Sequence, residues 1–427
     1  MGNRNLHSTS ALLISIILCL SAGARSQDKE RPKLKDFGVS LKRANRDPQK
    51  KALEPISKSN SKSESDLEVI KIETSLVSND LLVMDSKGNF VSGLSEKDFV
   101  ITEDGQPQQV GMFSTGDDAR VARSIVLIID YSGSQFPYIQ NSVAAAKNLV
   151  DKLPDSDSMA IVTDDVELLQ DFTRDKRKLK SKLDSLLART KPVSMENVPF
   201  PIRHFGKSQQ YSALLATLNE AFNNEDQRPI VIFQTDGDQL AFLRNSPIAS
   251  IRIEGPKKRM EPFLVNFSLD DICRAAEKAR ATIYTVVPGR QLINRSPAEQ
   301  QAITKAYMLE SPWGFGSLVP EVQQNAASRL PEAMVKEMAE NRTKMQTSLA
   351  EVSTASGGWT MFLEKPSDAD HIYSSILADM NRRYIVGYYP ANKEHDGKRR
   401  KLDITVRDHA DYVVLGRRWY FAPAPDQ

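Results

Sequence analysis

Cysteine is almost absent from this sequence, which contains only Cys19 and Cys273 among its 427 residues. Cys19 lies in an apolar segment that we predict to be cleaved off, so the mature chain would keep one thiol and form no internal disulfide. No cysteine and histidine residues have the spacing of a zinc site. Cys273 falls in the helical pattern "LDDICRAAEKA" and is predicted to pack as a small hydrophobic residue.

An excess of charge of either sign is also missing. The 57 Lys and Arg residues nearly balance the 55 Asp and Glu residues, which leaves a formal net charge of +2. A balance this close to neutral gives no electrostatic basis for binding nucleic acid or a membrane surface. The composition is that of a globular protein, and the length predicts about two or three domains.

The sequence lacks the motifs of several common enzyme classes: G-x-S-x-G, H-E-x-x-H, the P-loop and G-x-G-x-x-G. A phosphoryl-transfer hydrolase would need a second carboxylate two residues after Asp130, where this chain has Ser132. We therefore predict that the protein is not an enzyme, with a metal-dependent hydrolase as the weaker alternative. Four histidines are scattered without catalytic or zinc-binding spacing: His204, His371, His395 and His409.

The apolar run near the N-terminus is too short to cross a bilayer comfortably. "ALLISIILCLSAGA" follows Arg4 and ends in small residues before Gln27, as in a secretory signal peptide. We predict that residues 1–26 are this signal, with a retained anchor as the alternative, and that the protein is secreted or lies in the periplasm or cell envelope. Residues 27–66 are rich in Lys, Arg, Ser, Asp and Pro and are predicted to be a disordered linker.

Both ends of the remaining chain have β-strand patterns. Residues 67–118 alternate apolar and polar side chains between turn signals, which predicts a small β-domain. Residues 381–424 contain "RRYIVGYYP", "RKLDITVRD" and "YVVLGRRWYFAP", which are rich in aromatic and β-branched residues. We predict that strands from both ends form one β-sandwich; two separate β-units are also compatible with the pattern.

Residues 121–380 alternate strand-like and helix-like segments. The predicted strands are "SIVLIID", "SMAIVTDD", "RPIVIFQTD", "ATIYTVVP" and "GWTMFLE". Nearly continuous apolar strands are typical of a parallel sheet that is covered on both faces, so we predict an α/β, doubly wound, Rossmann-like domain. Residues 190–211 are predicted to be a long surface loop, and residues 289–340 a partly helical insertion.

Oxygen-bearing side chains follow the predicted strands. Asp130, Ser132 and Ser134 form D-x-S-x-S after the first strand, Asp236 follows a later strand in "TDGD", and Ser212 begins "SALLATLNEAF". Ligands of α/β sheets bind at the carboxyl ends of the strands, and hydroxyl and carboxylate oxygens suit a hard divalent cation. Mg²⁺ is the predicted ion, with Mn²⁺ or Ca²⁺ as alternatives. The alternatives without a bound ion are that the serines satisfy backbone donors and that Ser212 is a helix N-cap.

This arrangement resembles the metal-ion-dependent adhesion site of von Willebrand factor A domains. Further stretches, such as "GNFVSGLSEKDFVITEDGQPQQVGMFS", "STASGGWTMF" and "RRYIVGYYP", are similar to secreted bacterial VWFA-related (acidobacterial-type) domain proteins. The resemblance implies that Asp130, Ser132 and Ser134 form the first part of the site and that Asp236 is its second aspartate. The family pattern T-x-L-Y-x-A-L is replaced by "SALLATL", so Ser212 stands where the family has threonine.

The resemblance implies a protein-binding, adhesion-type module whose bound cation accepts an acidic side chain of a protein partner. No nucleic-acid partner and no membrane span in the mature protein are expected. A structural scaffold with a non-functional metal site is the main alternative. Asp164, Asp165 and Asp238 could support the site, but we expect them to be solvated turn residues.

Overall fold

The structure analysed is a computed structural model of the chain. It describes residues 34, 37–41, 76–118, 121–191, 205–223, 228–248, 265–310 and 330–423. The predicted signal peptide, most of the predicted linker and His204 lie outside these residues. Within the described ranges, no helix is both long enough and apolar enough to cross a membrane.

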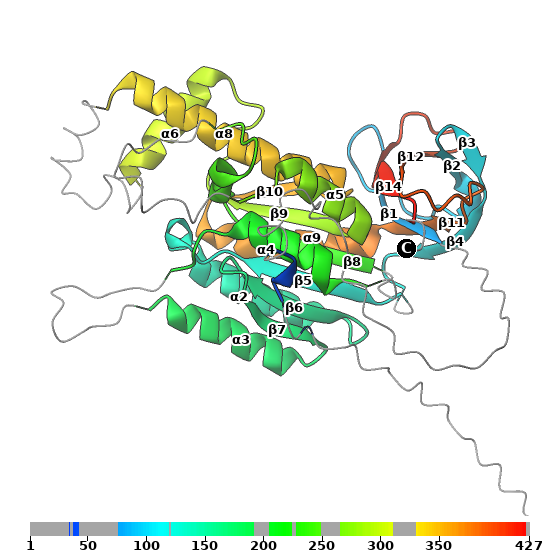
Figure 1. The fold of residues 1–427 in the computed structure, drawn as a ribbon, viewed down its shortest axis with the longest axis horizontal. Helices are drawn as coiled ribbons and strands as arrows, with labels where there is room; N and C mark the ends of the chain where they lie inside the picture. The colour runs from blue at the N-terminus through cyan, green and yellow to red at the C-terminus, as the bar shows by residue number, and fades with distance from the viewer. Residues whose placement is uncertain are drawn as a thin grey trace, which may run out of the picture. The chain divides into compact units, whose positions relative to one another are not determined.

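A six-stranded sheet forms the centre of the α/β region (Figure 1). The strand order is β10-β9-β8-β5-β6-β7, and every neighbouring pair is parallel except β6 and β7. The predicted fold class is therefore confirmed, with one additional antiparallel edge strand, β7. The strands are β5 (Arg123–Ile129), β6 (Ser158–Thr163), β7 (Leu168–Thr173), β8 (Arg228–Gln234), β9 (Thr282–Pro288) and β10 (Thr360–Leu363).

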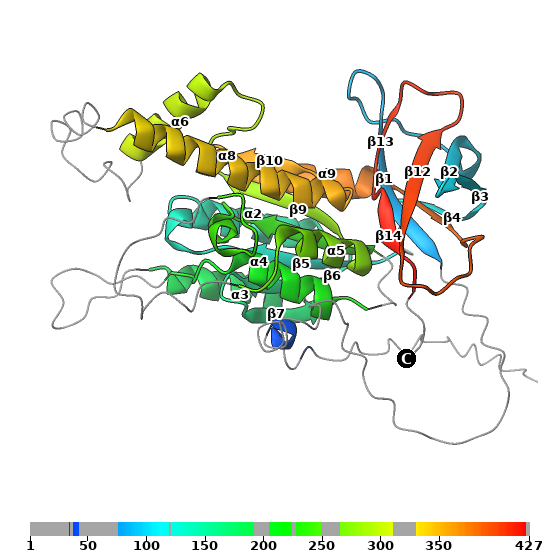
Figure 2. The same ribbon diagram turned by 45° about the horizontal axis from the view of Figure 1, so that its top comes forward.

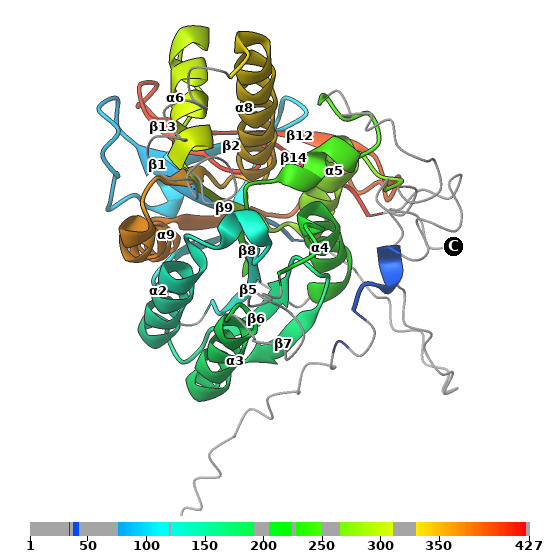
Figure 3. The same ribbon diagram turned by 90° about the vertical axis from the view of Figure 1, so that its left-hand side faces the viewer.

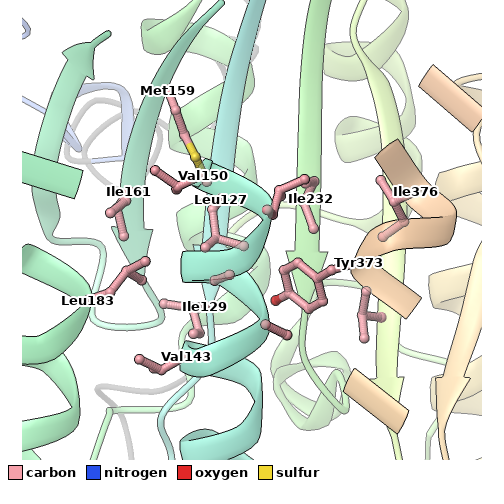
Figure 4. Packing of buried hydrophobic residues seen from close by; sticks show 14 of the residues in the cluster. Leu127, Ile129, Val143, Val150, Met159, Ile161, Leu183, Ile232, Tyr373 and Ile376 are labelled. Atoms are coloured by element: carbon pink, nitrogen blue, oxygen red, sulfur yellow. The ribbon is translucent and has the colours of Figure 1, made fainter. Parts of the chain in front are cut away.

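Helices cover both faces of this sheet because its central strands are apolar on both faces. Ile125, Leu127 and Ile129 of β5 pack with one layer of helices, and Val126 and Ile128 pack with the other. Figure 3 shows the two layers, and Figure 4 shows the first core from nearby. The first layer contains α2 (Ile139–Lys152), α3 (Lys176–Arg189) and α9 (Ala369–Arg382); the second contains α4 (Gln210–Ala216), η3 (Thr217–Ala221), α5 (Leu269–Ala279) and α8 (Glu332–Ala355).

The chain reverses its direction of winding between β5 and β8. From β5 it continues to the neighbouring β6 and the edge strand β7, and then returns to form β8 on the other side of β5. The carboxyl ends of β5 and β8 therefore meet at a topological switch point, where open α/β sheets form their ligand sites. Short helices follow these strand ends: η2 (Gly133–Gln135) after β5 and η4 (Asp238–Phe242) after β8.

Strands from both ends of the chain form two four-stranded sheets, of order β13-β1-β11-β4 and β14-β12-β2-β3 (Figure 2). Their apolar side chains share one core, so the predicted combination of the two ends is present. Tyr388 and Tyr420 donate to the buried Glu103 within this core, at 2.6 and 2.8 Å. The strands are β1 (Val77–Met84), β2 (Phe99–Glu103), β3 (Gln106–Gln108), β4 (Val110–Thr115), β11 (Tyr384–Tyr388), β12 (Arg399–Val406), β13 (Val413–Leu415) and β14 (Trp419–Phe421). Two short helices complete the described elements: η1 (Glu96–Asp98) precedes β2, and η6 (Pro366–Asp368) precedes α9.

The later interruption of the α/β pattern, predicted to be partly helical, contains helices in its described residues. It contains α6 (Pro297–Glu310), which packs beside α8. Helix α8 continues past residue 340 and contacts β9 and β10, so its second half belongs to the helical layer of the domain. In the earlier interruption, residues 192–204 lie outside the described part of the chain.

A short part of the predicted disordered linker packs against the α/β region. Phe37 contacts the second core, and the backbone N–H groups of Gly38 and Ser40 donate to the Glu220 carboxylate at 2.7 and 2.8 Å. The prediction of disorder is therefore wrong for these residues. Cys273 is half-buried beside the same core, and burial raises the pKa of its thiol to about 12, which keeps it protonated.

Candidate metal centre

Asp130 lies fully buried at the end of β5 and connects β5 to β8. Its N–H donates to the Gln234 carbonyl at 3.1 Å, and its Oδ2 accepts from the Thr235 hydroxyl at 2.9 Å. Its Oδ1 accepts from the backbone N–H of Ser132 at 2.9 Å. The carboxylate therefore fixes the turn in which the D-x-S-x-S serines lie.

The two serines of this motif are brought together by that turn. The Oγ atoms of Ser132 and Ser134 are 3.2 Å apart, at the start of η2. Gln135 donates to the Ser134 hydroxyl at 3.2 Å. Two hydroxyl oxygens thus lie side by side at the carboxyl end of β5, where the sequence predicted them.

Asp236 follows the end of β8, and its Oδ1 atom is buried without a hydrogen-bond partner in the described part of the chain. Gly237 next to it has φ +74°, a conformation that L side chains rarely adopt. A Cβ at Gly237 would also lie 3.1 Å from Leu349 and 3.2 Å from the Tyr211 hydroxyl. The close packing at this glycine holds the T-D-G turn against the surrounding helices.

Ser212 lies inside helix α4, whose N-cap is Gln209, so the N-cap alternative is wrong. Its N–H donates to Gln239 Oε1 at 2.9 Å, and its hydroxyl accepts from Gln239 Nε2 at 2.8 Å. Gln239 belongs to η4, directly after the T-D-G turn. This pair of hydrogen bonds ties the start of α4 to the segment that contains Asp236 and Asp238.

Gln210 is a site residue that the sequence did not predict. Its Nε2 donates to Asp130 Oδ2 at 2.9 Å and to Asp238 Oδ1 at 2.7 Å. One amide group therefore joins carboxylates from the ends of two strands. No motif includes this glutamine, and its position becomes apparent only when α4 is placed over the sheet edge.

Asp164 is buried, which corrects the expectation that it is a solvated turn residue. It accepts from the backbone N–H groups of Tyr131 at 3.1 Å and Ser208 at 2.9 Å, so it joins the turn after β6 to the D-x-S-x-S turn and to the loop before α4. A Cβ at Gly206 would lie 2.1 Å from both Asp164 carboxylate oxygens. The loop can approach this closely only with glycine at that position. Asp165 accepts from the Tyr131 hydroxyl.

These carboxylates repel one another in a poorly solvated place. Burial, followed by the charge of Asp236, raises the pKa of Asp130 to about 6. Burial, followed by the charge of Asp130, raises the pKa of Asp164 to about 9. Burial and then the charge of Asp236 raise the pKa of Asp238 well above its usual value. The site therefore has more negative charge than its surroundings stabilise.

The side chains present fit a hard divalent cation. Donor atoms at the strand ends are hydroxyl and carboxylate oxygens, which Mg²⁺, Mn²⁺ and Ca²⁺ accept. In the described part of the chain, Asp236 has a buried oxygen without a hydrogen-bond partner, and the repelling carboxylates favour a positive ion. Within the described ranges, no three His, Cys, Asp or Glu residues form a metal-binding group by themselves.

The fold and the site together define an open α/β domain with an all-oxygen cluster at its topological switch point. No protein-family profile matches the chain, and no curated protein sequence matches it. Several solved structures resemble it at low identity and low TM-score.

Among these is the conserved hypothetical protein BatB from Bacteroides thetaiotaomicron, at 16% identity over 61% of this chain and 98% of that chain, with a TM-score of 0.30. The vWF domain of the type V pili tip protein Mfa5 from Porphyromonas gingivalis is 14% identical over 61% of this chain and 96% of that chain, with a TM-score of 0.29. The manganese-loaded TRAP protein of Plasmodium vivax is 13% identical over 77% of this chain and 100% of that chain, with a TM-score of 0.28.

Proposed function

We propose that the protein is a protein-binding module of the adhesion type, located outside the cytoplasm, which binds an acidic side chain of a partner through a divalent cation. Ser132, Ser134 and Ser212 provide hydroxyl oxygens toward the cation. Asp130 and Asp236 hold its water ligands or bind it directly. Mg²⁺ is the favoured ion, and Mn²⁺ or Ca²⁺ are alternatives.

The observation that best supports this proposal is the buried Oδ1 of Asp236, which has no hydrogen-bond partner in the described ranges. A buried polar atom without a partner costs about 1–3 kcal/mol, and more when the group is charged. The cost is more easily understood if a ligand satisfies the oxygen. A cation with its water ligands would do so, and the neighbouring hydroxyls of Ser132 and Ser134 supply further oxygen donors.

The protein's own residues prepare the site before any ion arrives. Asp130, Asp164 and Gln210 hold the turns that carry the proposed donor oxygens through hydrogen bonds. When bound, the cation would supply an electrophilic position for a carboxylate oxygen. An octahedral ion held by few protein ligands retains exchangeable water, which is the position that a partner would take.

The test is Mn²⁺ binding and thermal unfolding of the purified protein with and without Mn²⁺ or Mg²⁺. We expect a cation-dependent rise in melting temperature that Asp236→Asn abolishes, because the amide has a similar shape without the charge. Asp155→Asn is the matched control, since the Asp155 side chain is 100% exposed. Equal cation responses in the wild type and Asp236→Asn would refute the proposed site.

One observation favours a second candidate, a structural scaffold that does not use the cation. Gln210 and Gln239 already donate to Asp130, Asp238 and Ser212, and these amide groups partly replace a positive ion. The same experiment separates the two candidates, because a scaffold would show no response to Mn²⁺ or Mg²⁺. Non-enzymatic function remains our expectation for both.

A further inference from the structure

Helix α8 covers the carboxyl ends of β8 and β9 with one of its faces. This face contains Arg342, Gln346 and Leu349. The Leu349 side chain would be 3.1 Å from a Cβ at Gly237, beside Asp236. Gln346 holds the segment after β9: its Oε1 accepts from the N–H of Leu292 at 2.7 Å. Residues at positions i, i+4 and i+7 share a helix face, so Arg342 projects from the same face, one turn before Gln346.

Within the described residues, Arg342 forms no ion pair. Its guanidinium stacks over the Tyr307 ring of α6 at 3.8 Å, and its Nη2 is 3.4 Å from where a Cβ at Gly289 would lie. Its Nη1 is buried and makes no hydrogen bond within the described ranges. The insertion formed by α6 and α8 therefore fixes a half-buried positive charge whose donors are not all used.

Arg342 lies at the same edge of the sheet as the candidate metal centre, because its Nη2 adjoins Gly289, which follows β9, and Leu349 on the same helix face adjoins Gly237. Burial lowers the pKa of Arg342, and the neighbouring Tyr307 and then the charge of Asp236 act in the opposite direction. In the part of the chain that the structure describes, Arg342 Nη1 and Asp236 Oδ1 are both buried without a hydrogen-bond partner, so these two atoms do not pair with each other. A ligand that satisfies both needs a positive part toward Asp236 and a negative part toward Arg342.

A lone arginine beside a divalent-cation site weakens cation binding by repulsion. This arrangement is favourable once an anion joins the cation, because the anion is attracted by both positive charges. A carboxylate suits the planar guanidinium because its two oxygens match two parallel N–H donors. A neutral backbone carbonyl would gain much less.

We propose that Arg342 is a specificity-determining residue that binds the partner's carboxylate beside the cation, so that the site selects an Asp or Glu side chain over a neutral oxygen ligand. The inference rests on the proposed cation site and adds the insertion helices to the binding surface. It explains why α6 and α8 pack together at this position: Tyr307 of one helix orients Arg342 of the other.

The experiment measures Mn²⁺ affinity and acetate affinity separately in the full-length mature protein. Mn²⁺ binding is followed by water-proton relaxation, and acetate is then titrated into the Mn²⁺-loaded protein, where it displaces water from the ion. Arg342→Gln is expected to raise the half-saturating acetate concentration about ten-fold, as for the loss of a charge-assisted hydrogen-bonded pair. Its Mn²⁺ affinity is expected to stay equal or to increase, because a repelling charge is removed.

Two further variants make the result interpretable. Arg342→Lys keeps the charge without the paired donors and is expected to give an intermediate acetate affinity. Arg295→Gln removes an exposed arginine near α6 that is 3.9 Å from Glu299, and is expected to leave both affinities unchanged. Circular dichroism and melting temperature confirm that each variant is folded.

The outcomes separate this inference from the proposed function. If the wild type binds Mn²⁺ and Arg342→Gln binds acetate as well as the wild type does, the role of Arg342 is refuted and the cation site stands. If the wild type does not bind Mn²⁺, both proposals are refuted. A loss of acetate affinity in Arg295→Gln equal to that in Arg342→Gln would show a general charge effect and would also refute the specific role.

Discussion

Buried charges are balanced differently at the two edges of the central sheet. At the amino-terminal edge, three arginines that are almost completely buried are matched with carboxylates. At the carboxyl-terminal edge, Asp130, Asp164 and Asp238 have raised pKa values, and within the described residues none of them forms an ion pair with Lys or Arg. The matched pairs at the first edge are Arg123–Asp157 (2.6 Å), Arg228–Asp80 (3.0 Å) and Arg383–Asp379 (2.8 Å).

The difference separates a structural edge from the edge at which we propose that the ligand binds. Arg228 connects the start of β8 to Asp80 of β1 and also donates to the Gly116 and Met380 carbonyls, both at 2.9 Å. Its charge and donors are used within the protein, where they join the α/β region to the β-sandwich. The aspartates at the other edge keep unbalanced charge, which is what a cation site requires before its ion binds.

The largest effect is expected at the structural edge. Arg228→Met should lower the free energy of unfolding by about 3–5 kcal/mol, because it leaves Asp80 and two carbonyls without their donor. Urea unfolding measures this change, and Arg177→Met, at a side chain that is 93% exposed, is the control. If Arg228→Met lowers the free energy of unfolding by less than the control does, the buried Arg228–Asp80 pair does not stabilise the contact between the α/β region and the β-sandwich.

The pH dependence of stability should distinguish the proposed cation-binding edge from the edge that contains the ion pairs. The folded-state pKa values of Asp130 and Asp164, about 6 and about 9, exceed the usual 3.8, so the folded state retains protons that the unfolded state releases. Without a cation, this contribution to stability is complete below about pH 4 and is lost as pH rises through 6 and then 9. The slope is about 1.4 kcal/mol per pH unit for each retained proton.

A bound cation favours the ionised carboxylates and should reverse this trend. The stabilisation by Mg²⁺, measured as the difference between urea unfolding in Mg²⁺ and in metal-free buffer, is therefore expected to increase from pH 5 to pH 8. Taking the difference removes the contributions of carboxylates elsewhere in the protein. A difference that does not change with pH would contradict the electrostatic description of this edge.

Gly206→Ala tests how closely the loop before α4 must approach the site. The new Cβ would overlap the Asp164 carboxylate, since it would lie only 2.1 Å from both carboxylate oxygens. We expect a loss of about 1–3 kcal/mol in unfolding free energy from the forced displacement, together with weaker Mn²⁺ binding. Lys207→Ala, at the next residue, should change neither quantity; equal behaviour of the two variants would argue against a fixed loop.

Ser212→Ala should give the smallest effect. Gln239 loses an acceptor but keeps the N–H of residue 212 as a donor, so the expected loss of stability is about 1 kcal/mol. Mn²⁺ affinity should fall several-fold if the hydroxyl contributes to the site. Thr217→Val is the matched control, because its buried hydroxyl on the following turn lacks a hydrogen-bond partner in the described ranges. If Mn²⁺ affinity is unchanged in Ser212→Ala, the serine only positions Gln239.

Much of the fold could be predicted because burial leaves a clear pattern in the sequence. Ile139, Val143, Ala146 and Val150 recur at helical spacing in the sequence, and they lie on the buried face of α2. Strand β7 escaped prediction because "LLQDFT" is short and lies at a sheet edge, where only Leu169 is buried. Asp164 was misjudged because an aspartate in a turn is usually solvated, and nothing local indicates that another loop covers it.

The sequence by itself determined most of the strands, the helices between them, and the position of Asp130, Ser132, Ser134 and Asp236 after buried strands. These features depend on local periodicity and on the alternation of strand and helix, both of which are recorded along the chain. Tertiary structure alone decided that Gln210 joins two carboxylates, that Asp164 is buried, and that Arg342 lies at the same edge. Those relations join residues far apart in sequence, and the packing of α4 and α8 over the sheet, rather than any local pattern, brings them together.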